Sequence, residues 1–152
     1  MVQTGLGLQF WRNGDYVCIP MGKNGYHLFI GQTVEVVKDN HQYRLRTLRY
    51  EYRLSAGPSF DDRCLVRWEY NSREYRVSEH PRHHVQMDET IECPPSLTLD
   101  LGQIHLPSGW ITIEELVRFF MTELSVRPAA RNWDTLLQKS EEKFREWTAR
   151  SV

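Results

Sequence analysis

The sequence of 152 residues has few cysteines and no long hydrophobic run. These two features argue against a disulfide-rich protein and against a membrane-spanning one. No segment approaches the roughly 18 apolar residues that cross a bilayer as a helix, so we expect no contact with a membrane. The three cysteines, Cys18, Cys64 and Cys93, are far apart and form no CxxC pair. An odd and scattered set of this kind suits a reducing compartment rather than a disulfide framework. We therefore predict a cytoplasmic protein.

Internal repeats, low-complexity tracts and Pro-, Gly- or Ser-rich linkers are also absent. The first residues lack the basic and apolar regions of a secretory signal. A chain of this length fits one domain and buries roughly two-thirds of its unfolded surface. We predict a single domain over residues 1–152.

The net charge of −1 hides an uneven distribution of charge along the chain. Residues 41–84 contain nine Arg against six Asp or Glu, together with four of the six His, whereas residues 85–126 contain one Arg against seven acids. A basic half beside an acidic flank favours an anionic ligand such as RNA. The alternative is that Arg simply supplies the polar outward face of the strands.

The N-terminal two-thirds of the chain is typical of β-strands separated by short turns. Residues 15–20, 26–31 and 33–38 are short, β-branched or aromatic segments, with turn signals at 21–25 and at "GQ". Residues 43–54 and 63–71 alternate apolar and polar side chains, which predicts a hairpin with one buried face. A change of phase between Tyr43 and Leu48 predicts a bulge near Arg46 or Thr47. On the polar face we expect Arg49, Glu51, Arg53, Arg67 and Glu69.

The last third of the chain is typical of helices. In residues 112–126 apolar side chains recur at helical spacing, and Thr112 and Glu115 match a capping box. A second helix is expected within residues 132–151, and a short strand at 97–101. The fold class predicted is α+β, with an antiparallel sheet from the N-terminal two-thirds packed by two C-terminal helices.

The segment "SEHPRHHVQ" places His80, His83 and His84 within five positions, after a stretch, residues 73–77, that reads as a further strand. Imidazole acts as a general acid or base near neutral pH, and the planar guanidinium of Arg matches phosphate oxygens. These residue types predict cleavage of RNA without a cofactor. The candidate catalytic residues are His83, His84 and His80, and the candidate substrate ligands are Arg82, Arg67, Arg49, Arg53 and Asn71.

Two other interpretations of the histidines stay open. A metal would need a third or fourth ligand, and the donors at hand, Asp88, Cys93 and His105, lie at no recognisable spacing, so we predict no metal. The histidines can also be solvated or hydrogen-bonded in a loop after Pro81. Adjacent His83 and His84 cannot both point the same way in a strand.

Four segments resemble the TumE-type toxin family of prokaryotic type II toxin–antitoxin pairs. They are "RYEYRL", "DRCLVRWEYN", "EHPRHH" and "TIEELVRFF", which together span about residues 43–125. The resemblance implies an RNA-cleaving toxin and a cognate antitoxin as partner. It supports His83 and, less directly, Arg67, Asn71 and His84. Two departures are Tyr70, where the family tends to have Asp, and Gln86 in place of a later His.

The sequence therefore predicts a small ribonuclease-like toxin, or a diverged relative of one. The alternative is a non-catalytic module that docks a protein through its sheet or second helix, where Trp133 and Trp147 lie on one stripe. Trp is over-represented among interface residues. Metal-dependent hydrolysis is a third hypothesis, and the oligomeric state is left open.

Overall fold

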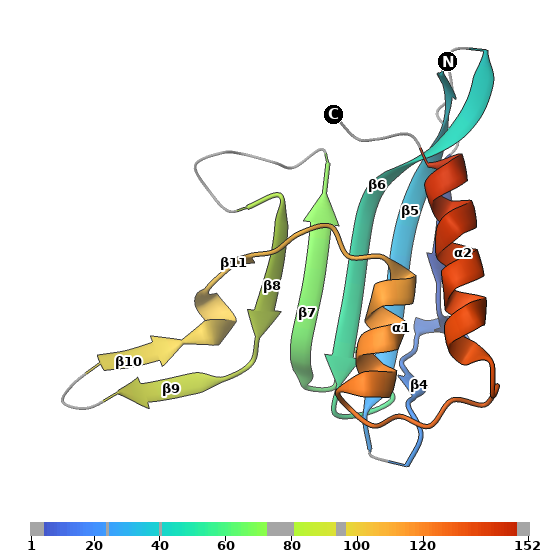
Figure 1. The fold of residues 1–152 in the computed structure, drawn as a ribbon. Helices are drawn as coiled ribbons and strands as arrows, with labels where there is room; N and C mark the ends of the chain where they lie inside the picture. The colour runs from blue at the N-terminus through green and yellow to red at the C-terminus, as the bar shows by residue number, and fades with distance from the viewer. Residues whose placement is uncertain (1–4, 24, 40, 73–80, 94–96, 149–152) are drawn as a thin grey trace.

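The computed structural model describes residues 5–23, 25–39, 41–72, 81–93 and 97–148 (Figure 1). Its main feature is an antiparallel sheet with strand order β1-β5-β6-β7-β8-β11, and β4 also pairs with β5. The strands of this sheet are β1 (Gly5–Gln9), β4 (Ile19–Pro20), β5 (His27–Asp39), β6 (Gln42–Ser55), β7 (Cys64–Asn71), β8 (His83–Met87) and β11 (Leu106–Pro107). Two C-terminal helices follow, so the predicted α+β class is confirmed.

Two small strand pairs accompany the sheet. One is β2 (Trp11–Arg12) with β3 (Asp15–Tyr16), and the other is β9 (Thr90–Cys93) with β10 (Leu97–Asp100). The 3-10 helix η1 (Leu101–Gln103) connects β10 to β11. The strand predicted near residues 97–101 is therefore confirmed. The strand expected at residues 73–77, like His80, lies outside the described residues.

Strand β5 is longer than predicted, because "GQ" does not form a turn. Gly31 pairs with Glu51 on β6 and with Gln9 on β1, so both neighbours hold it in an extended strand. A Cβ atom added at Gly31 would lie 2.9 Å from the ring of Phe29. The glycine makes room for an aromatic ring, and the predicted turn was wrong.

The hairpin of β6 and β7 has the two predicted faces. Tyr50, Tyr52 and Tyr70 are buried on the face that packs against the helices. At the bulge, the β6 partner changes from Arg49 opposite Thr33 to Thr47 opposite Val34, which leaves Leu48 as the extra residue. The predicted irregularity is thus confirmed, one residue beyond Thr47.

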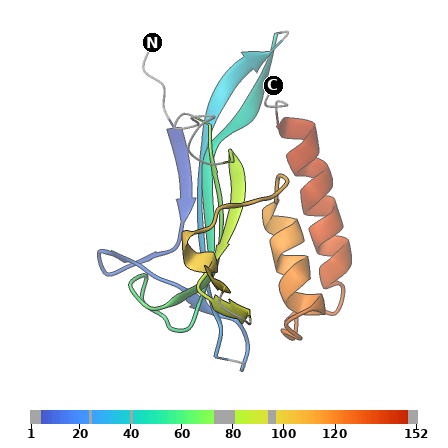
Figure 2. The ribbon, with the colours of Figure 1, turned by 90° about the vertical axis from the view of Figure 1, so that its left-hand side faces the viewer.

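Helices α1 (Ile113–Thr122) and α2 (Trp133–Trp147) lie on one side of the sheet (Figure 2). The capping box of Thr112 and Glu115 is present at the start of α1, as predicted. Leu116 and Phe120 of α1 enter the core, whereas α2 packs beside α1 and against β6 and buries no residue fully. We call the sheet surface away from the helices the open face. In the part of the chain that is described, neither helix has the length and apolar character needed to cross a bilayer.

Candidate functional site

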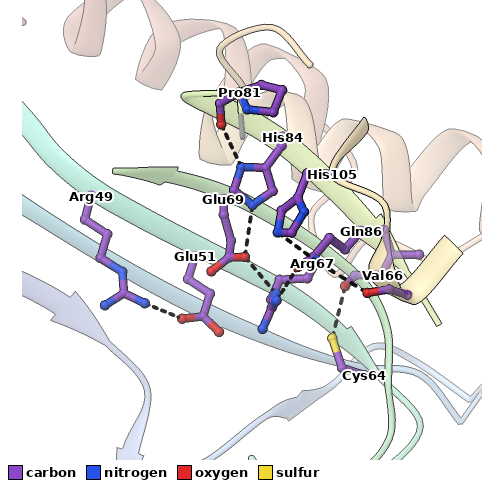
Figure 3. A network of polar contacts seen from close by, with 11 residues as sticks. Arg49, Glu51, Cys64, Val66, Arg67, Glu69, Pro81, His84, Gln86 and His105 are labelled. Carbon is purple, nitrogen blue, oxygen red and sulfur yellow. Dashed lines mark hydrogen bonds and ion pairs between the residues drawn. The ribbon is translucent and has the colours of Figure 1, made fainter. Parts of the chain in front are cut away.

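The open face carries two like-charged pairs on adjoining strands. Arg53 of β6 lies directly opposite Arg67 of β7, and Glu51 lies directly opposite Glu69. Like charges in this position destabilise a sheet by roughly 0.2–1 kcal/mol. Each carboxylate is instead paired along its own strand. Glu51 Oε2 accepts a hydrogen bond from Arg49 Nη2 at 3.0 Å, and Glu69 Oε2 lies 2.9 Å from Arg67 Nε (Figure 3).

These charged side chains line a pocket of about 410 Å³. Its charged lining comes from strands β6 and β7, and its aromatic lining comes from Tyr16, Phe29 and Phe60. The volume falls within the roughly 300–1,000 Å³ of small-molecule sites. The open face is therefore hollowed where its charges are concentrated.

His84 projects from β8 onto this face, opposite Glu69 in the register. Its Nδ1 lies 3.0 Å from the carbonyl oxygen of Pro81, and its Nε2 lies 3.3 Å from Glu69 Oε2 (Figure 3). Both neighbours are hydrogen-bond acceptors, so donating to both requires an N–H on each ring nitrogen. His84 is only 7% exposed and reaches the pocket through Glu69.

Gln86 connects a second histidine to the same group of side chains. Its carbonyl oxygen accepts a hydrogen bond from Arg67, and its amide nitrogen lies 3.2 Å from Nε2 of His105. The rings of His84 and His105 meet edge to face, with their centroids 4.7 Å apart. His105 is brought here by β11, which pairs Pro107 with His84. Sequence reasoning considered His105 only as a metal donor, because nothing in its local spacing predicts this long-range pairing.

His83 lies on the opposite face of the sheet from His84. Its ring stacks on Tyr70 at 4.4 Å between centroids, and its Nδ1 lies 3.4 Å from the hydroxyl of Tyr50. Burial lowers the pKa of His83, and the charges of Arg82 and His84 lower it further. Successive strand residues point to opposite faces, so His83 cannot join His84 and Arg67 on one ligand. It is not part of the candidate site.

The remaining predicted ligands are distributed unevenly. Arg53 lines the pocket, with its guanidinium carbon 4.0 Å from the centre of the Phe60 ring, and Arg49 lines the pocket through its pair with Glu51. Asn71 ends β7 opposite Arg49 and does not line the pocket. Arg82 directly precedes β8 and acts electrostatically on His83. The last candidate, His80, lies outside the described residues.

The described residues contain no cluster of side chains that supports the metal interpretation. Among them, no three His, Cys, Asp or Glu side chains are grouped so that they could hold a metal ion. Asp88, one of the donors considered, is paired with Arg63, with 2.5 Å between its Oδ2 and Nε. The side chain of Cys93 is not described.

The chain matches no family model, no curated protein and no solved structure. The resemblance to TumE-type toxins therefore stays a prediction. Arg67, Glu69 and His84, with the pocket beside them, are the features of the protein that point to a function.

Proposed function

We propose that the protein binds RNA on its open face and cleaves the backbone without a metal ion. One observation carries the proposal: a carboxylate, an imidazole and a guanidinium meet at a single atom. Glu69 Oε2 lies 2.9 Å from Arg67 Nε and 3.3 Å from His84 Nε2. Attack by a neighbouring 2′-hydroxyl needs a group that accepts a proton, a group that donates one, and a cation for the charge on phosphorus. These three side chains supply one of each.

In the proposed step, Glu69 takes the proton of the 2′-hydroxyl as the O2′ atom attacks phosphorus. The bond from phosphorus to O5′ breaks, and His84 donates a proton to the departing oxygen. The products are a 2′,3′-cyclic phosphate and a 5′-hydroxyl end. In the free protein Arg67 and His84 each contact Glu69, so RNA has to displace them from its carboxylate. Catalytic contacts of this kind often reach their working geometry only with substrate bound.

Two arginines in the pocket support an anionic ligand. Arg53 and Arg67 are opposite each other in the register of β6 and β7, and both line the pocket. A phosphate between them would replace their repulsion by two charge-assisted contacts, which are stronger than neutral hydrogen bonds. The guanidinium fork also matches the spacing of phosphate oxygens.

Cleavage of a labelled single-stranded RNA under single-turnover conditions tests the proposal. We expect Glu69→Gln and His84→Gln each to slow cleavage by about 10²- to 10⁴-fold, the usual contribution of a general acid or base. Replacing the 2′-hydroxyl at the cleaved position by hydrogen should abolish the reaction, and a chelator should leave it unchanged.

His41→Asn is the matched control, because His41 is exposed in a hairpin turn with a positive φ of 69°, which Asn tolerates. It should cleave at the wild-type rate. Circular dichroism of each variant separates a catalytic loss from unfolding. Equal rates for wild type, Glu69→Gln and His84→Gln would refute the assigned roles. Loss of activity on adding chelator would favour the metal-dependent hypothesis instead.

The TumE-type resemblance extends the proposal to a toxin with a cognate antitoxin, acting in the cytoplasm. Cys18 and Cys64 are free thiols, which suits a reducing compartment. Expression in a bacterial host should arrest growth, and Glu69→Gln should relieve the arrest. If the wild-type protein does not affect growth, the toxin assignment is wrong. The proposal of RNA cleavage would then still be tested by the cleavage assay.

A second candidate function is a non-catalytic module that binds a protein through α2. Trp147 is 56% exposed and Leu136 is 50% exposed on this helix, whereas Trp133 is half-buried. Exposed Trp is a common interface anchor. Binding to the product of the neighbouring reading frame, measured by calorimetry, should weaken at least about tenfold in Trp147→Ser. If the Trp147→Ser variant binds as tightly as wild type, α2 is not the docking surface.

A further inference from the structure

The pocket has an aromatic end that the cleavage step does not use. Tyr16, Phe29 and Phe60 meet there, with ring centroids between 4.9 and 5.8 Å apart. They come from β3, from β5 and from the loop between β6 and β7. Figure 2 shows that β3 and this loop project from the side of the sheet away from the helices. Three separate segments therefore build one aromatic wall.

The three rings differ in exposure. Phe29 is buried and Phe60 is half-buried, whereas Tyr16 is 41% exposed although it lines the pocket. The guanidinium of Arg53 lies against Phe60. The wall thus presents an aromatic surface to the pocket and a cation at its edge. Proteins that bind single-stranded nucleic acids combine the same two kinds of group.

The sheet register places this wall beside the proposed phosphate ligands. Phe29 of β5 lies directly opposite Arg53 of β6, and Arg53 lies directly opposite Arg67 of β7. Adjoining strands are about 4.8 Å apart, so one aromatic residue and two arginines follow one another across three strands. A nucleotide has a matching arrangement, because its base and its phosphate are joined through one sugar. The base would lie on the aromatic residue and the phosphate beside the arginines.

We infer that the aromatic wall stacks on an unpaired nucleobase, so that the protein selects single-stranded RNA. This inference rests on the proposed function, because it assigns the substrate class of the same pocket. Stacking on an aromatic side chain tolerates every base, since each has a π-face. In a duplex the base faces are covered by their neighbours, and sequence-reading proteins therefore favour splayed, single-stranded bases.

Binding is measured with the Glu69→Gln protein, in which cleavage is expected to be too slow to disturb the titration. Tyr16→Leu in that background should weaken binding of a single-stranded RNA by about 5- to 150-fold, the range contributed by stacking one base. Tyr16→Phe and Tyr16→Trp keep an aromatic ring and should bind within about twofold of the parent or more tightly. The matching RNA duplex should bind more weakly than the single strand.

Two further ligands remove any dependence on the folding of the variants. An RNA in which one nucleotide lacks its base should bind the parent protein less tightly. With an RNA that lacks every base, Tyr16→Leu should cause no further loss. If duplex and single strand bind equally, or if Tyr16→Leu binds single-stranded RNA as the parent does, the inference is wrong while the cleavage mechanism stands. If neither RNA binds and wild type cleaves none, the proposed function itself falls.

Discussion

The two faces of the β6–β7 hairpin differ completely in chemistry although they share the same backbone. On the helix face, Tyr50, Tyr52 and Tyr70 are buried in the core with α1. On the open face, Arg67 and Glu69 alternate with Val66, Trp68 and Tyr70 along β7 and line a pocket. The period of two in a strand allows this division. The helix face contributes the buried core that stabilises the fold. The open face carries charged side chains, whose burial in a core would cost free energy.

The adjacent histidines of β8 show the same division on a smaller scale. His83 stacks on Tyr70 in the core, whereas His84 contacts Glu69 on the open face. Residue type alone does not determine the role of either ring. Substitutions on the two faces should therefore separate stability from activity.

The largest effect on stability is expected from the helix face. Phe120 is fully buried, so Phe120→Ala should lower the free energy of unfolding by about 3–5 kcal/mol. Phe119 on the same helix is 38% exposed, and Phe119→Ala should cost less than about half as much. Urea unfolding of both variants measures the difference. Equal losses would contradict the assignment of the core to this face.

His83→Ala should lower the free energy of unfolding by about 1–3 kcal/mol, because the ring packs on Tyr70 and beside Trp110. The folded variant should still cleave RNA within a few-fold of the wild-type rate. His84→Ala should behave in the opposite way, with a large loss of cleavage. A comparison of unfolding midpoints with single-turnover rates tests this reversal. Loss of cleavage in a well-folded His83→Ala protein would show that His83 belongs to the catalytic site after all.

The pH dependence of stability should report the burial of His83. The pKa of His83 is lowered from its ordinary value of 6.5, mainly by burial. The unfolded chain therefore binds a proton more readily, and this contribution to stability is complete above pH 6.5 and declines as the pH falls below it. Thermal midpoints measured from about pH 7.5 to about pH 5.5 should fall less steeply in His83→Leu. Identical slopes in both proteins would contradict the burial effect.

The smallest effect on stability is expected at Arg49, whose side chain is 54% exposed in its pair with Glu51. Arg49→Gln should change the free energy of unfolding by less than about 0.5 kcal/mol. If Arg49 contacts a phosphate, the slope of log K against log salt for single-stranded RNA should fall by about 0.7. An unchanged slope would place Arg49 outside the RNA-binding surface.

Much of the fold could be predicted because its signals are local. The faces of β6 and β7 follow from strict alternation, and the start of α1 follows from Thr112 and Glu115. The turn predicted at Gly31 failed because a glycine that makes room for a neighbouring ring looks the same in sequence as one that bends the chain.

The candidate site was predicted only in part. The charged face could be predicted, since Arg67 and Glu69 share a phase of the alternating pattern. The partnership of His84 and His105 could not, because it depends on the pairing of β11 with β8, two strands that are distant in sequence. The separation of His83 from His84 follows from strand geometry, but only once the segment after Pro81 is known to be a strand.

The shape of the pocket depends on the absence of a side chain at Gly31. Phe29 lies over this position and touches both Phe60 and Tyr16. A methyl group there would force the Phe29 ring to shift, because the added carbon would lie 2.9 Å from it. Replacement of Gly31 would therefore act first on the aromatic lining of the pocket, through a residue that contacts no ligand itself.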